Sequence, residues 1–77
     1  MNPNAVARHV ALLLPSATNV RVSERGGVYA MLCEVEGRAR CVQFIALGLY
    51  GAPAWTLPTW PRSDIHIAND IAAALGN

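Results

Sequence analysis

Four side chains in this 77-residue sequence are soft metal ligands or nucleophiles: Cys33, Cys41, His9 and His66. A structural zinc site needs three or four such ligands, and the usual sequence signature includes a C-x2-C pair. The two cysteines stand too far apart to form that pair. We therefore predict no metal and no other cofactor, and we expect both thiols to be structural, since free cysteine is among the most often buried residues.

The cysteines flank a turn predicted at Gly37. A three-residue loop over 36–38 would place the two cysteines opposite each other and would also set Glu34 opposite Arg40, a favourable cross-strand pair. A loop of another length would break both matches. The register of this hairpin, and with it a cross-strand disulfide, is left open by the sequence.

The residue types of a hydrolytic triad occur close together as Ser63, Asp64, His66 and Asp70. A triad requires the nucleophile, base and orienting group to point at one another, and on one helix only His66 and Asp70, spaced i and i+4, are neighbours. We interpret Ser63 as a helix N-cap, and His66 and Asp70 as a surface pair. No catalytic residue is predicted, and we expect a protein that is not an enzyme.

Nucleotide-binding motifs are also missing. Gly48 and Gly51 have the GxxG spacing of the loop that clamps RNA in KH domains, but Leu49 and Tyr50 between them are apolar or bulky. We expect a turn that ends a strand there. Neither G-x-G-x-x-G nor a Walker loop occurs, so the sequence does not support nucleotide binding.

An aromatic segment at 48–61 carries the most distinctive residues. Its prolines exclude a regular helix or a central strand, although a short edge strand over 54–57 is compatible with them. The indoles of Trp55 and Trp60 either complete the core of a small domain or form a binding or dimer surface. The candidate partner-binding residues are Tyr50, Trp55, Trp60, Arg38, Arg40 and Arg62.

Composition narrows the class of protein. Hydrophobic residues make up 53% and charged residues 14% of the chain, so it should fold and leave apolar surface uncovered. We therefore expect a homodimer. The net charge of +1 does not provide the positive field of a general nucleic-acid binder. All basic residues are Arg, which reflects either codon usage or the suitability of Arg for interfaces.

Apolar periodicity and turn residues predict the elements that carry these side chains. Asn2 with Pro3 and Ser63 favour helix starts, and Gly26 and Gly37 mark turns. The expected segments are a helix over 3–14, strands over 20–24, 28–36 and 38–47, an irregular segment over 48–61 and a helix over 64–75. This is a single α+β domain over 1–77, an αβββα arrangement in which a three-stranded antiparallel meander has both helices on one face. The middle strands are apolar on both faces, so we expect the second face to meet a partner or the next segment.

No targeting signal is recognised. The apolar run from Val10 to Leu14 is shorter than the roughly 7–15 residues of a secretory signal, and no stretch approaches the ~20 apolar residues that span a bilayer. The cysteines do not form the framework of a small secreted domain. We expect a cytoplasmic protein.

These observations favour a small non-enzymatic domain that inhibits or adapts a larger protein by covering part of its surface. In size and composition it resembles the small inhibitors of phages and mobile elements, anti-CRISPR proteins among them. That likeness has no motif behind it. The alternative is a dimeric nucleic-acid-binding protein that uses the hairpin arginines Arg21, Arg25, Arg38 and Arg40. No membrane partner is expected.

Overall fold

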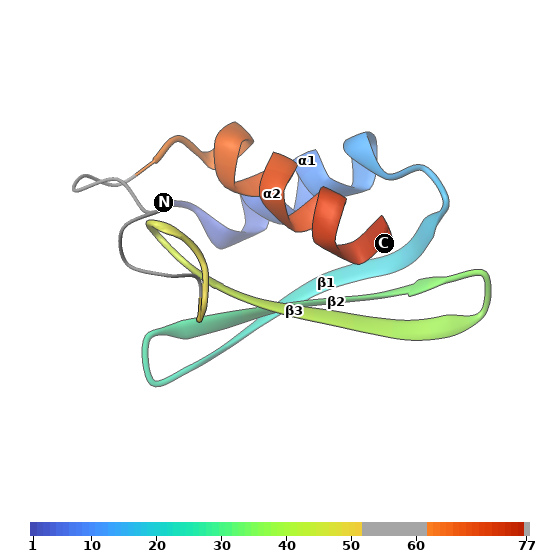
Figure 1. Ribbon diagram of the computed structural model, residues 1–77, viewed down its shortest axis with the longest axis horizontal. Coiled ribbons are helices and arrows are strands. Elements are labelled where there is room, and N and C mark those ends of the chain that lie inside the picture. The colour runs from blue at the N-terminus through green and yellow to red at the C-terminus, as the bar shows by residue number, and fades with distance from the viewer. Residues whose placement is uncertain (52–61, 77) are drawn as a thin grey trace.

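A computed structural model describes residues 1–51 and 62–76. Their elements are α1 (Pro3–Leu13), β1 (Ala17–Arg25), β2 (Val28–Val35), β3 (Arg38–Ile45), β4 (Gly48–Leu49) and α2 (Asp64–Gly76). Both helices lie on the same side of one antiparallel sheet (Figure 1). The predicted α+β class and the helix, strand, strand, strand, helix order are confirmed.

Side-chain caps start both helices where the sequence predicted. The Asn2 side-chain oxygen accepts from the backbone N–H groups of Asn4 at 3.1 Å and Ala5 at 3.2 Å. Ser63 Oγ accepts from the backbone N–H of His66 at 3.4 Å. These bonds satisfy N–H groups that have no partner inside the helix, which stabilises the first turn.

The two helices run in the same direction, as contacts between their first residues and between their last residues show. The backbone N–H of Asn2 donates to the Asp64 carboxylate, 3.3 Å away, at the start of α2. At the other end Gly76 lies beside Leu14, where an added Cβ would be 3.4 Å from the leucine Cδ1. Across the sheet, α1 packs against β1 while α2 packs against β3 and β4.

Two-residue turns connect the first three strands. Gly26 and Gly27 have φ values of +61° and +83°, and Glu36 and Gly37 have +52° and +76°. Positive φ at both central residues is the pattern of type I′ turns, whose twist matches that of the strands they join. The β2–β3 turn is therefore one residue shorter than the three-residue loop considered from the sequence, so the pairing that depended on that loop does not form.

The sheet contains a fourth strand that the sequence did not predict. Gly48 pairs with Ile45, and Leu49 pairs with Phe44, where the sequence indicated only a turn closing the third strand. A strand of two residues is too short to show the alternation by which strands are recognised. The strand order of the described sheet is β1-β2-β3-β4.

One hydrophobic core lies between the helices and the sheet. Its buried residues are Val6, Val10, Met31, Cys33, Phe44, Ile67, Ala68, Ile71 and Leu75. The rings of Tyr29 and Phe44 stack over it with centroids 5.5 Å apart. Both helices contribute to this core, whereas Leu13 at the end of α1 is exposed. None of the described helices is both long and apolar enough to cross a membrane.

Candidate functional site

The candidate site is the side of the sheet opposite both helices, which we call the outer face. Residues alternate between the two faces of a strand, and Met31 and Cys33 are buried under the helices. The intervening positions of β2 and their cross-strand partners therefore form the outer face. Its described members are Thr18, Arg21, Ser23, Arg25, Val28, Ala30, Leu32, Glu34, Ala39, Cys41, Gln43 and Ile45.

The middle of the outer face is apolar. Val28, Ala30, Leu32 and Ile45 lie there, and all are partly buried although both described helices are on the other side (Figure 1). A solvated face of an antiparallel sheet normally alternates to polar side chains. Three successive outer positions of β2 instead carry apolar residues, so this face departs from the usual alternation.

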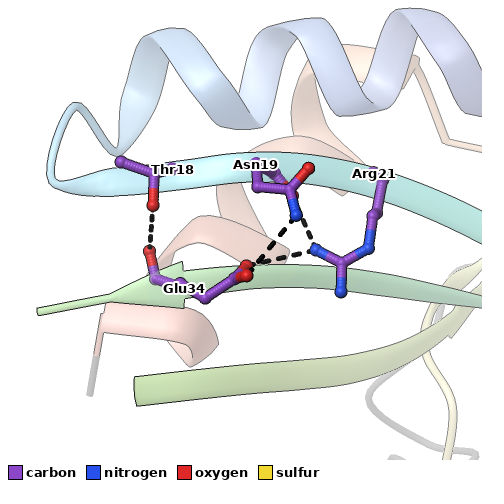
Figure 2. Close-up of polar contacts among 4 residues, drawn as sticks. All are labelled: Thr18, Asn19, Arg21 and Glu34. Atoms are coloured by element: carbon purple, nitrogen blue, oxygen red, sulfur yellow. Dashed lines mark hydrogen bonds and ion pairs between the residues drawn. The ribbon is translucent and has the colours of Figure 1, made fainter. Parts of the chain in front are cut away.

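A polar cluster closes one end of the outer face (Figure 2). Arg21 Nη1 donates to Glu34 Oε2 at 3.1 Å and to the backbone oxygen of Asn19 at 2.9 Å. Asn19 Nδ2 donates to Glu34 Oε1 at 3.4 Å, and Thr18 Oγ1 donates to the backbone oxygen of Glu34 at 3.4 Å. Asn19 has a φ of +54° at a bulge in β1. The cluster therefore bridges the bulge and places the carboxylate of Glu34 beside the guanidinium of Arg21.

This cluster replaces the cross-strand pair considered from the sequence. Glu34 faces Ala39 on β3, and Arg40 faces Cys33. The Arg21–Glu34 pair was not predictable from the sequence, because the two residues come from different strands and the bulge shifts their register. The exposed ion pair stabilises the fold by no more than about 1 kcal/mol.

The hairpin arginines do not share one face. Arg21 and Arg25 belong to the outer face. Arg38 and Arg40 pair with Val35 and Cys33 and so lie on the helix side of the sheet. A single protomer thus presents no continuous surface formed by all the hairpin arginines.

Of the other predicted partner-binding residues, the structure describes Tyr50 and Arg62. Tyr50 follows β4 and is 56% exposed. Arg62 forms an ion pair with Asp70 and its backbone N–H donates to the carbonyl oxygen of Ala46 at 3.2 Å. Trp55, Trp60 and the edge strand considered over 54–57 lie outside the described residues.

The two cysteines occupy different sides of the sheet. Cys33 is buried on the helix side, Cys41 is exposed on the outer face opposite Leu32, and both are free thiols. A disulfide between them is therefore not formed. Burial, followed by the negative charge of Glu34, raises the pKa of the Cys33 thiol.

Triad-like and metal-binding geometry is not assembled in the part of the chain that the structure describes. The ion pair of Asp70 is with Arg62, while His66 is exposed and Ser63 caps α2. Among the described residues no group of three His, Cys, Asp or Glu side chains is arranged to hold a metal ion.

Comparison with protein-family models gives no match, and neither curated proteins nor solved structures match the chain significantly.

Proposed function

We propose that this protein is a small non-enzymatic binding domain that inhibits or adapts a larger protein by covering part of its surface. The observation that carries the proposal is the apolar strip of Val28, Ala30 and Leu32 on the outer face of β2. Arg21, Arg25 and Gln43 lie around it and are exposed. An apolar centre with a polar rim rich in Arg is the usual composition of a protein interface.

The sheet is suited to this role because it is a rigid surface. Type I′ turns join its long strands, and its helix side is locked to the core. Rigid contact surfaces lose little conformational entropy on binding. The adaptor or inhibitor role follows from that surface together with the small size of the domain, and resembles the action of small phage and mobile-element inhibitors of anti-CRISPR style.

The proposal includes self-association and a cytoplasmic location. A dimer would bring more of the apolar surface out of water, and the indoles of Trp55 and Trp60 are further candidates for contact with a partner. The free thiols of Cys33 and Cys41 support a reducing compartment.

The test replaces an apolar residue of the outer face by an acidic one. Leu32→Asp introduces a charge within the apolar strip of the proposed contact, whereas Leu12→Asp introduces the same charge on α1 at a residue that is 77% exposed. The tagged full chain would capture its partner from the native host, and the purified partner would then be titrated against each variant. Far-UV circular dichroism and urea unfolding would verify that both variants are folded.

We expect Leu32→Asp to weaken binding by at least about tenfold, because it replaces an apolar side chain of the interface by a charged group that is costly to bury. Leu12→Asp should bind as the wild type does. Wild-type affinity in a folded Leu32→Asp variant would overturn the proposal.

A further inference from the structure

One edge of the sheet is a long strand with an unpaired side. β1 spans nine residues, Ala17–Arg25, and β2 covers only one of its sides. No other described segment pairs with it. The bulge between Thr18 and Arg21 limits the regular free edge to residues 20–25. Such an edge exposes backbone donors and acceptors and can pair with another strand.

The turn determines which backbone groups point outward. Arg25 and Val28 flank the two-residue turn and form the first pair of the β1–β2 ladder. Residues that flank a turn of this length exchange hydrogen bonds, and the pattern then alternates along the strand. The N–H and C=O groups of Glu24 and Val22 therefore point away from β2. Ser23, Glu24 and Arg25 are exposed, and Figure 1 shows the β1–β2 turn below the layer of the two helices.

We propose that this edge pairs with the same edge of a second copy of the chain, antiparallel about a two-fold axis at Val22. In this register Val22 faces Val22 of the second copy. Val20 faces Glu24 of the second copy, and Arg21 faces Ser23 of the second copy. The two sheets become one continuous sheet with both pairs of helices on one side.

The charges of β1 favour this register over its neighbours. Centring the axis on Arg21 would set that residue opposite itself, and centring it on Ser23 would set Arg21 opposite Arg25. Centring it on Glu24 would set two carboxylates together. Like charges directly opposite each other destabilise a sheet, whereas β-branched pairs stabilise it. Val22 also packs against the hydrophobic core, so its pairing extends an apolar surface.

The arrangement is closed, since a two-fold interface uses the same surface on both copies. It also sets two outer faces side by side and doubles the apolar surface available to a larger protein. This inference rests on the part of the proposed function that concerns self-association. The Leu32→Asp variant tests binding to another protein separately.

A charge pair at Ser23 tests the register. Ser23 is exposed on the outer face, and each dimer sets it opposite Arg21 twice. We expect Ser23→Glu to tighten the dimer and Ser23→Arg to weaken it, each by roughly 2- to 30-fold. Sedimentation equilibrium of the purified full chain measures the dissociation constants. Equal dimerisation by both variants would overturn the register.

A second variant tests the use of the edge itself. Glu24→Pro removes an outward N–H, which an edge strand tolerates but an added strand needs. We expect this variant to be a monomer by sedimentation equilibrium. Circular dichroism verifies that it is folded. A wild-type chain that is monomeric up to its solubility limit, or a Glu24→Pro variant that still dimerises, would overturn edge pairing. If Leu32→Asp loses the partner while the wild type is monomeric, edge pairing fails and the proposed contact surface stands.

Discussion

Cys33 and Cys41 are close in sequence but lie in different environments. The β2–β3 register sends Cys33 into the core and Cys41 to the outer face. The thiolate is the reactive form of cysteine, and burial both blocks access to Cys33 and raises its pKa. The two thiols should therefore differ strongly in reactivity.

We predict that iodoacetamide at about pH 8 modifies the exposed Cys41 rapidly and the buried Cys33 only after unfolding. Mass spectrometry of a Cys41→Ser variant, with Cys33→Ser as its counterpart, measures this directly. Native-state labelling of Cys33 at the rate of Cys41 would contradict the burial.

The raised pKa of Cys33 also predicts how stability depends on pH. The unfolded chain releases this proton near the ordinary pKa of 9.0, whereas the folded protein retains it to higher pH. The unfolded state then binds fewer protons, so stability falls as pH rises. The contribution of the Cys33 thiol should be complete below that pKa and should be lost as pH rises toward the raised one. Urea unfolding of the wild type and Cys33→Ser across this range should show a steeper loss in the wild type.

The two tryptophans carry a prediction from sequence alone. We expect Trp55→Ala or Trp60→Ala to weaken partner binding or dimerisation more than replacement of any single arginine, because large aromatic anchors dominate interface energies. The same titration and sedimentation measurements apply. Unchanged binding by a folded variant that lacks both indoles would show that another surface is used.

At the scale of elements, the β2–β3 turn contains a strained residue. Glu36 has a φ of +52°, a conformation that glycine and asparagine adopt more readily than glutamate. The turn also sets the register that separates the two cysteines and sends Arg38 and Arg40 to the helix side.

We predict that Glu36→Asn raises the free energy of unfolding by about 1 kcal/mol, the lower end of the cost of such strain. Glu36→Ala removes the same charge but keeps the strain, so it should give no such gain. Urea unfolding compares the three proteins. Equal stabilisation by both variants would attribute the effect to charge and not to backbone strain.

At the scale of the whole molecule, the arginines of the described residues are not gathered on one surface. The hairpin arginines divide between the two faces of the sheet, and Arg21 and Arg62 are engaged by Glu34 and Asp70. Phosphate contacts require cations gathered on one surface.

We therefore predict that partner affinity changes by less than about tenfold between roughly 50 and 200 mM salt, whereas a protein with six to ten phosphate contacts loses about 10³–10⁵ in affinity. Isothermal titration at both salt concentrations measures this. Fluorescence anisotropy with a labelled DNA duplex serves as the parallel measurement. A steep salt dependence together with binding of the duplex would favour the dimeric nucleic-acid alternative.

Local signals in the sequence were enough for the order of the two helices and the three long strands, and for most of their boundaries. Asn2 and Ser63 cap their helices as predicted, and Gly26 and Gly37 mark turns. Capping, turn conformation and apolar periodicity act over a few neighbouring residues, so the local sequence determines them.

The composition of the site was predictable only in part. The sequence showed that the middle strands are apolar on both faces, but it assigned the candidate residues by type, as aromatic or arginine. It did not show that Val28, Ala30 and Leu32 share the face opposite the helices, because that depends on which face the helices cover.

Only the tertiary structure decided the remaining features. The contact of Arg21 with Glu34 and the ion pair of Arg62 with Asp70 join residues that are not neighbours in the sequence. Their energies depend on the register and twist of the assembled sheet and on the placement of α2 over it. Those arrangements form only when the helices and strands bury their apolar faces together, so no local pattern of residues encodes them.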